Sequence, residues 1–135
     1  MVQTRKQRIG RWGETVATYF LEQRGYQVLA RNVRTGRGEI DLIARLPGDS
    51  QEARAGGGVL VFVEVKTRTN EHFGLPEEAV DARKLEHVFR AAEAYLQEHA
   101  ELAEQEWRID VIAIQGRPGE RAEDVRIEHF ENISA

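Results

Sequence analysis

Two segments, GEIDLIAR at residues 38–45 and VLVFVEVKTR at residues 59–68, decide the fold expected for this chain. Each has the length and apolar content of a strand, and a polar, glycine-rich connector at residues 47–58 separates them. We expect them to pair as neighbouring strands of one sheet. The second segment is the most apolar run in the protein, yet it carries Glu64 and Lys66, and charges in a buried strand need a reason.

Strand alternation determines which of these side chains share a face. In the second segment it places Glu64 and Lys66 side by side on one face. If the two strands form an antiparallel hairpin that closes symmetrically across Leu46 and Val59, Asp41 lies directly opposite Glu64. A slip of one residue would move Asp41 to the other face. The assumed register therefore gathers Asp41, Glu64 and Lys66 into a single patch.

Such a patch has a chemical use. Two carboxylates held across a strand pair repel each other unless one is protonated or a cation is bound. Magnesium takes oxygen ligands and keeps several waters, so Asp41, Glu64 and the backbone carbonyl of Val65 would suffice as protein ligands. Lys66 could then position or deprotonate a water, or balance charge on a phosphate. The alternative is a cross-strand ion-pair ladder on a wet sheet face, worth on the order of a few tenths of a kcal/mol.

Composition limits the class of protein. The chain has 135 residues, and we expect residues 1–135 to form a single domain with its own core. The absence of cysteine excludes thiol catalysis and thiolate metal ligands and favours a reducing compartment. No apolar stretch of a signal peptide follows the basic N-terminus, and the longest apolar run, Val59–Val63, is too short to cross a bilayer. We therefore expect a cytoplasmic protein without a membrane segment.

The sequence lacks the motifs of several common classes of enzyme and binding protein. No phosphate-loop lysine follows the triple glycine, no G-x-G-x-x-G is present, and the four histidines show no paired metal spacing. The only serines are Ser50 and Ser134, so a serine hydrolase is not expected.

Charge is distributed unevenly along the chain. The formal net charge is −4, but residues 1–46 hold nine Lys or Arg against four acids, whereas residues 69–107 hold three against ten. This asymmetry fits a basic face that meets a polyanion, with an acidic helix turned away from it. An uneven scatter of surface charge without a function is equally compatible with these counts.

An amphipathic helix is predicted for residues 4–24, because apolar residues recur there at helical spacing: Ile9, Trp12, Val16, Tyr19 and Phe20. Small residues widen this apolar arc, and Glu14 falls at its edge. Glu14 is therefore placed to look into the margin of the interior. The alternative is a solvated boundary glutamate, since acids are seldom buried without a partner.

A hairpin is predicted next, from a strand at residues 26–34 through turn residues 35–38 into the acidic strand. Three arginines cluster around it: Arg31, Arg34 and Arg37. They form either a phosphate-contacting patch or edge-strand charges that discourage aggregation. In the acidic strand, alternation places Ile40 and Leu42 together, on the face opposite Asp41.

The second half of the chain predicts a helix from Pro76 to Leu102, a strand at residues 107–114 and an edge strand at residues 125–130. Lys84 stands almost alone as a cation on the acidic face of that helix. A surface ion pair with a neighbouring helix acid is favoured for it over a phosphate or active-site contact. Asp110 is either a further acid of the site or, as we favour, the partner of Arg108 or another basic residue in a structural pair.

The order of the charged motifs resembles the PD-(D/E)XK nuclease superfamily. These motifs are Glu14 on the opening helix, Asp41 within GEIDLIA, and Glu64 with Lys66 within VEVKTR. More closely, the chain resembles the YraN-like family of bacterial proteins, which are similar in turn to archaeal Holliday-junction resolvases. The resemblance covers nearly the whole chain and includes RNVR at 31–34, FGLP at 73–76 with Lys84, and RIDVI at 108–112.

The resemblance implies a restriction-endonuclease-like α/β core with a central mixed sheet flanked by helices. Its order would be a helix, a three-stranded meander, a helix and a further strand. Asp41 and Glu64 would be metal ligands and Lys66 the catalytic lysine. Glu14 would be a fourth catalytic member that helps to hold the metal or orients Lys66. Ile40 stands where the superfamily usually has proline, at a position that tolerates other residues.

The implied function is a Mg²⁺- or Mn²⁺-dependent endonuclease acting on DNA phosphodiester bonds, by analogy in branched or recombination and repair intermediates. The hairpin arginines, with Thr67, Arg68 and Lys84, would bind the nucleic-acid backbone with little sequence discrimination. A homodimer is expected by analogy with resolvase-like relatives. The alternative is a non-catalytic nucleic-acid-binding module that keeps the nuclease fold within a DNA-processing assembly.

Overall fold

A five-stranded sheet organises the molecule, and the computed structural model describes residues 2–48, 58–69 and 81–133. In chain order the elements are helix α1 (Arg5–Gln23), strands β1 (Gln27–Thr35), β2 (Gly38–Leu46) and β3 (Val59–Arg68), helix α3 (Ala82–Glu98), the short 3₁₀ turn η3 (Ala100–Leu102), strand β4 (Trp107–Gln115), the 3₁₀ turn η4 (Ala122–Asp124) and strand β5 (Arg126–Phe130). Helix, meander, helix and further strand thus follow each other as the resemblance implies.

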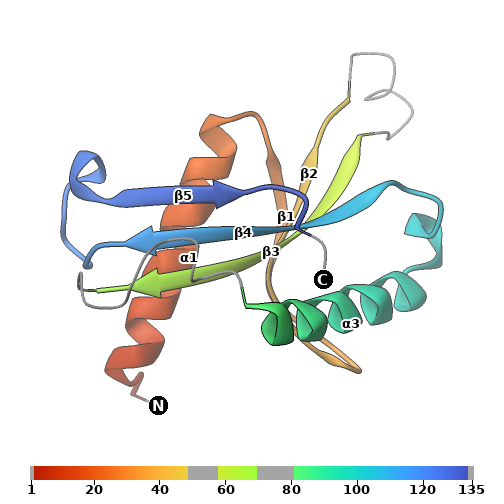
Figure 1. Cartoon of the computed structure of the whole chain (residues 1–135), viewed down its shortest axis with the longest axis horizontal. Helices are drawn as coiled ribbons and strands as arrows, with labels where there is room; N and C mark the ends of the chain where they lie inside the picture. Colours follow the sequence, from red (N-terminus) through yellow and green to blue (C-terminus); the bar gives the residue numbers. More distant parts are fainter. Residues whose placement is uncertain (1, 49–57, 70–80, 134–135) are drawn as a thin grey trace.

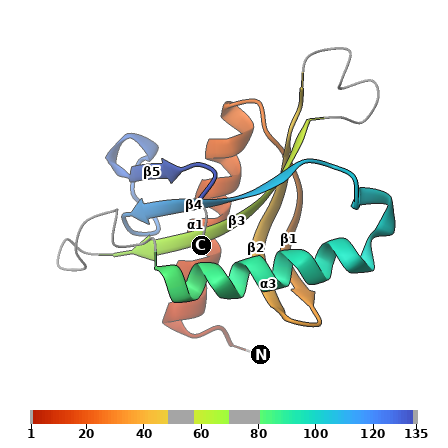
Figure 2. The ribbon, with the colours of Figure 1, turned by 45° about the vertical axis from the view of Figure 1, so that its right-hand side comes forward.

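The sheet is mixed. Its strands lie in the order β1-β2-β3-β4-β5, and all neighbours are antiparallel except β3 and β4, which are parallel. Helix α1 crosses one face of the sheet and α3 lies along the other (Figures 1 and 2). Strand β5 is at an edge, as predicted. These observations confirm the α/β class with a mixed sheet flanked by helices.

The pairing of β2 with β3 has the register on which the predicted patch depends. Leu46 pairs with Val59 and Leu42 pairs with Val63, so one further step of the same register places Asp41 opposite Glu64. Strand β3 alternates as expected. Its residues Leu60 and Phe62 pack in the core under α3, whereas Val61 and Val63 pack in the core under α1.

The predicted alternation of β2 is wrong at Ile40. This residue packs with Ile43 in the core under α3, while Leu42 packs in the core under α1. The strand pairing places Asn32 of β1 opposite Asp41, and Asn32 has a left-handed φ of 51°. A left-handed residue breaks the regular pleat of a hairpin, so the faces change at the level of Asp41.

Helix α1 begins at a capping box, in which Thr4 and Gln7 each bond the backbone N–H of the other. It ends before Gly25, whose φ of 88° suits glycine. The apolar arc is confirmed in part, because Tyr19 is 61% exposed instead of packed on the sheet. The buried face of the helix instead includes the small residues Gly13 and Ala17. Gly13 approaches β3 so closely that a Cβ atom there would collide with Thr67 Oγ1.

Helix α3 is capped by Asp81, whose side chain accepts from the backbone N–H groups of Arg83 and Lys84. The predicted start at Pro76 lies outside the described residues. The predicted end at Leu102 is late, because the α-helix stops at Glu98 and a 3₁₀ turn follows.

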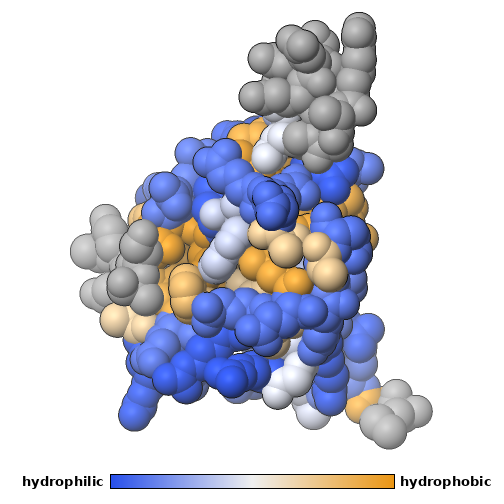
Figure 3. Space-filling model, turned by 90° about the vertical axis from the view of Figure 1, so that its right-hand side faces the viewer, coloured by the Kyte–Doolittle hydropathy of each residue, from blue (hydrophilic) through white to orange (hydrophobic). Residues whose placement is uncertain are grey.

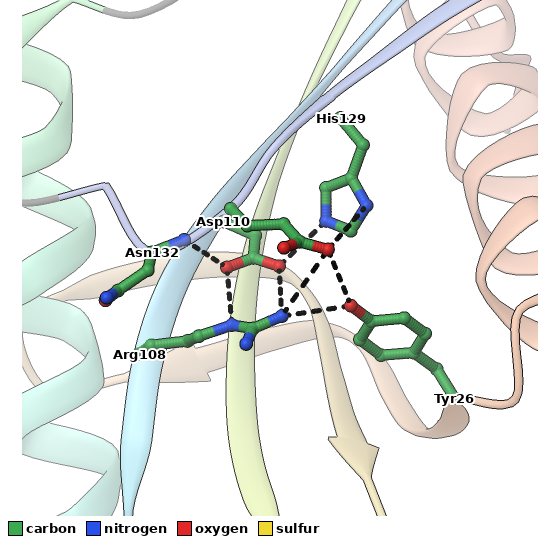
Figure 4. A network of polar contacts seen from close by, with 6 residues as sticks. Tyr26, Arg108, Asp110, His129 and Asn132 are labelled. Carbon is green, nitrogen blue, oxygen red and sulfur yellow. Dashed lines mark hydrogen bonds and ion pairs between the residues drawn. The ribbon is translucent and has the colours of Figure 1, made fainter.

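A buried polar network joins β4 and β5 to the start of β1 (Figure 4). Asp110 is fully buried, accepts from Arg108 Nε and the Asn132 backbone at 2.9 Å each, and lies 2.7 Å from His129 Nε2. Arg108 also donates to the Tyr26 hydroxyl at 2.9 Å. Burial would raise the pKa of Asp110, but its hydrogen bonds more than offset this and lower it. The predicted pairing with Arg108 is confirmed.

Hydrophilic side chains cover most of the face shown in Figure 3, and they enclose an apolar area at its centre. Apolar side chains also reach solvent on α3, where Phe89 is 39% exposed and its ring lies 5.5 Å from that of Trp107. Within residues 2–48, 58–69 and 81–133, no helix has the length and apolarity needed to cross a membrane.

Candidate active site

Two carboxyl groups meet where β2 and β3 pair. Asp41 Oδ2 accepts a hydrogen bond from the backbone N–H of Val65 at 2.8 Å, and the Asp41 carboxyl is also hydrogen-bonded to Glu64. Glu64 is only 8% exposed, and burial together with Asp41 raises its pKa to about 7. Burial also raises the pKa of Asp41. The pair therefore retains a proton near neutral pH, and this burial is inconsistent with an ion-pair ladder on a wet sheet face.

Two lysines face the carboxyl pair. Lys84 Nζ of α3 lies 3.4 Å from Glu64 Oε1, and Lys84 is also hydrogen-bonded to Lys66. Burial, this hydrogen bond and the charge of Lys84 lower the pKa of Lys66 to about 8. For Lys84, burial is outweighed by the contacts with Lys66 and Glu64, so its pKa is raised. An amine accepts a hydrogen bond only when neutral, so Lys66, which has the lowered pKa, is the acceptor once it has lost its proton, and Lys84 is the donor.

The contact made by Lys84 differs from the favoured expectation of a helix-surface ion pair with Glu77, Asp81 or Glu86, of which Glu77 lies outside the described residues. Among the residues that the structure describes, its ion-pair partner is Glu64 on the sheet, not an acid of its own helix. The reason is its position one helical turn before Val88, which is buried, so that Lys84 extends the inward-facing stripe of α3.

Glu14 is buried on α1, as one of the two sequence readings expects, with 8% of its surface exposed. Its Oε1 accepts from Asn32 Nδ2 at 2.9 Å and lies 4.0 Å from Arg31 Nη2. Burial raises the pKa of Glu14, the bond from Asn32 opposes this, and the nearby charge of Asp41 raises it further. Glu14 therefore lies near the carboxyl pair but is held by β1, whereas Lys66 is held by Lys84.

The three arginines of the first hairpin have different surroundings. Arg31 donates to Thr15 Oγ1 at 3.0 Å and to the Arg11 carbonyl at 3.4 Å, so its guanidinium binds α1. Arg34 is exposed on β1, and Arg37 lines a hollow of about 420 Å³ beside the carboxyl pair. A role of these three in phosphate binding stays a prediction.

Thr67 and Arg68 continue β3 beyond the catalytic candidates. Thr67 packs against Gly13 of α1. Thr67 and Arg68 line an open groove of about 650 Å³, which Lys66 and Lys84 also line. The groove thus begins at the two lysines and leads away from the carboxyl pair.

The donor atoms fit a hard divalent cation. Asp41 and Glu64 offer carboxylate oxygens from adjacent strands, and their raised pKa values reflect two acids held together in a buried place. Over the described ranges, no three His, Asp or Glu side chains gather as a metal-holding group. Within those ranges, the further protein ligand expected for Mg²⁺ or Mn²⁺ is the Val65 carbonyl, and water would complete the coordination.

Sequence reasoning did not single out three contributors to this region. Asn32 lies within a predicted strand, where asparagine is disfavoured, and this mismatch could have indicated an irregular backbone at that position. Arg5 and Lys6 line the 650 Å³ groove, and their only signal was the excess of basic residues near the N-terminus.

The fold and site define an α/β protein with a mixed sheet, a buried carboxyl pair and an adjacent lysine pair. The model of the uncharacterised protein family UPF0102 matches residues 13–114. The chain is 44% identical over 126 residues to a UPF0102 protein of Roseiflexus castenholzii, covering 93% of this chain and 92% of that protein. It is 43% identical over 122 residues to one of Syntrophotalea carbinolica, covering 90% and 87%. The chain belongs to UPF0102, the YraN-like family that its motifs resemble.

One solved structure similar to this chain is that of Pyrococcus furiosus SfsA in complex with Ca²⁺. The similarity has a TM-score of 0.34 at 14% sequence identity, and it covers 89% of this chain. The matched region spans 60% of the SfsA chain.

Proposed function

We propose that this protein is a divalent-metal-dependent, endonuclease-like hydrolase of DNA phosphodiester bonds. The observation that carries the proposal is the meeting of Asp41 and Glu64 beside Lys66: their carboxyl groups are hydrogen-bonded, Glu64 is buried and Asp41 is partly buried. Acids held together in this way are destabilising unless a proton or a cation lies between them. Perturbed acids beside a perturbed base are typical of catalytic sites.

Asp41, Glu64 and the Val65 carbonyl would hold Mg²⁺ or Mn²⁺. When bound, such a cation supplies Lewis-acid activation of the phosphate and neutralises part of its charge. The Val65 N–H fixes the Asp41 carboxylate at 2.8 Å, so its orientation is set before any ligand arrives. The ammonium of Lys84, which already contacts Glu64 and Lys66, would also contact a phosphate oxygen bound next to Glu64.

Lys66 is the proton acceptor in this proposal. A pKa of about 8 leaves a large neutral fraction at slightly alkaline pH. A water oxygen attacks phosphorus and forms the new P–O bond, while a water proton passes to Lys66 Nζ. The bond from phosphorus to the leaving oxygen breaks, and that oxygen takes a proton from solvent.

A binding module that does not cut DNA is the second candidate, and the ion pair between Lys84 and Glu64 favours it. Lys84 Nζ lies 3.4 Å from the carboxylate and already supplies a positive charge there. If this pair persists in the complex, the site would bind a backbone without holding a cation.

Cleavage assays separate the two candidates. Labelled branched, flap and linear DNA would be incubated with the native chain in Mg²⁺ or Mn²⁺, and in EDTA. We expect metal-dependent cutting that Asp41→Asn and Lys66→Met each reduce about 100-fold or more. Glu22→Gln, an exposed acid on α1, is the matched control and should cut like the native chain.

Retained binding without any cutting by the native chain would favour the binding module. Equal cutting by the native chain and both variants would show that the carboxyl and lysine groups do not catalyse the reaction.

A further inference from the structure

A line of basic side chains leads away from the carboxyl pair. The groove of about 650 Å³ is lined by Arg5 and Lys6 at the start of α1, by Lys66 and Arg68 of β3, and by Lys84 of α3. Its lining among the described residues includes no acid. A concave, single-sign surface on a chain of net charge −4 concentrates positive potential and attracts an anionic ligand.

Two smaller hollows extend this groove. At one end, Lys84 also lines the hollow of about 420 Å³ that contains Glu64. At the other end, Arg5 also lines a hollow of about 350 Å³ with Arg8 and Arg117. The three hollows therefore follow one another, joined at Lys84 and at Arg5, and we call them together the basic track. The carboxyl pair lies beside the joint at Lys84.

The lining of the basic track indicates how a nucleic acid would be held. Between Lys84 and Arg117, its described polar lining is ammonium, guanidinium and the hydroxyls of Thr67 and Thr69. The apolar part is aliphatic, from Ile9, Val65 and Pro118, and the described lining has no aromatic ring. Proteins that bind single strands stack bases on aromatic side chains. Proteins that hold a duplex by its backbone use basic and hydroxyl groups on phosphates. The chemistry of the lining therefore fits phosphates better than bases.

We propose that the basic track is the docking site for one backbone of duplex DNA, with Arg5 and Lys6 contacting phosphates to one side of the carboxyl pair. The choice of DNA rests on the proposed function. The proposal goes beyond that function because it places the duplex along α1 and the end of β3, and it does not use Arg31 or Arg34, which line none of the three hollows. Contacts of this kind bind irrespective of sequence and weaken as salt rises.

Duplex binding in EDTA tests the basic track apart from catalysis. A fluorescein-labelled blunt DNA duplex, its single strand and the matching RNA duplex would be titrated by anisotropy at several KCl concentrations. For Arg5→Ala/Lys6→Ala we expect about tenfold weaker duplex binding or more, and a slope of log K against log salt that is smaller by about 2. Alanine favours the helix, so this variant should keep its fold, and circular dichroism melting checks this.

The matched control is Arg24→Ala/Arg121→Ala, which removes the same charge from residues that line none of the three hollows. It should bind the duplex within about twofold of the native chain and keep its salt slope. An equal loss in both variants, or an unchanged slope for Arg5→Ala/Lys6→Ala, overturns the basic track.

The other possible results of these assays also test the proposal. Tighter binding of the single strand, or of the RNA duplex, overturns the assignment to duplex DNA. The binding assay contains EDTA and no metal, so its result is independent of cutting. A duplex that binds through Arg5 and Lys6 in EDTA, but is not cut when Mg²⁺ is supplied, supports the track and contradicts the proposed hydrolysis. Cutting that does not depend on these two residues contradicts the track alone.

Discussion

The ammonium of Lys84 lies 3.4 Å from Glu64 Oε1 and is hydrogen-bonded to Lys66, so one cation on α3 contacts both an acid and a base on β3. This contact joins the helix to the strand that carries the catalytic candidates. It also affects the protonation of its neighbours: burial lowers the pKa of Lys66 and Lys84 lowers it further, whereas burial raises the pKa of Glu64 and Lys84 opposes that rise.

Replacing Lys84 should move the alkaline dependence of the reaction. In the native chain, kcat at saturating DNA should rise with pH with a midpoint near 8, as Lys66 loses its proton. In Lys84→Gln the neighbouring charge is gone, so the pKa of Lys66 rises and the midpoint should move upward. Stopped-time cleavage across a pH series measures this shift, and an unchanged midpoint would mean that Lys66 is not the titrating group.

The metal-free protein should lose stability as pH rises from about 4.5 to 7. Glu64 has a folded pKa of about 7, above its ordinary 4.5, so its stabilising contribution is full below 4.5 and is lost as pH rises through 7. Glu64→Gln cannot ionise and should be more stable than the native chain at pH 8 by roughly 1–3 kcal/mol. Urea unfolding in EDTA at pH 4.5 and pH 8 measures the difference, which should be small at the lower pH.

Adding Mg²⁺ should stabilise the native chain and not the variants of the carboxyl pair. A cation that binds only the folded state adds about 2.7 kcal/mol at roughly 100 times its Kd. Thermal melting with and without Mg²⁺, in the absence of DNA, compares the native chain with Asp41→Asn. A melting temperature that Mg²⁺ raises equally in both would place the cation elsewhere.

Loss of Asp110 should be costly, because Arg108 and His129 would lose a buried partner. Asp110→Ala should reduce the free energy of unfolding by about 3–5 kcal/mol. The folded pKa of Asp110 is below 3.8, so its contribution is present above that pH and is lost as pH falls through the lowered value. Glu123→Ala, in an exposed pair 3.7 Å from Arg121, should change stability by less than about 1 kcal/mol.

Two glycines of α1 should respond oppositely to the same substitution. Gly13→Ala forces a methyl group into Thr67 and should destabilise the protein by about 1–3 kcal/mol. Gly10→Ala meets nothing within 4 Å and should stabilise the helix by up to about 1 kcal/mol. Chemical denaturation measures both, and a neutral Gly13→Ala would mean that α1 can move away from β3.

Most of the fold could be predicted from the sequence, since each element has a strong local signal. The alternation of β3, the turn at residues 35–38 and the closure of β2 on β3 across Leu46 and Val59 all appear in the structure. Asp41 therefore meets Glu64 as the register requires. The exception at Ile40 arises from Asn32 on the neighbouring strand, and such a neighbour effect lies outside a one-strand alternation rule.

The contacts between layers could not be predicted in the same way. Pairing of Lys84 with Glu64 depends on how α3 packs across the sheet. From the sequence alone, the acids close to Lys84 along the chain were the favoured ion-pair partners. The binding of Arg31 to α1 and the grouping of Arg5 with Lys66 likewise depend on where α1 lies. The spacing of residues along one helix or strand determines which side chains share a face of that element. Which faces of different elements pack together depends on how the helices dock on the sheet.

The contact between Gly13 and Thr67 has an evolutionary consequence. Each residue is the immediate neighbour of a candidate site residue, Gly13 of Glu14 and Thr67 of Lys66, so one close approach fixes the spacing of helix and strand beside both. A side chain at position 13 is then tolerated only when position 67 becomes smaller. We therefore expect the two positions to co-vary among relatives, so that a larger residue at position 13 occurs with a smaller one at position 67.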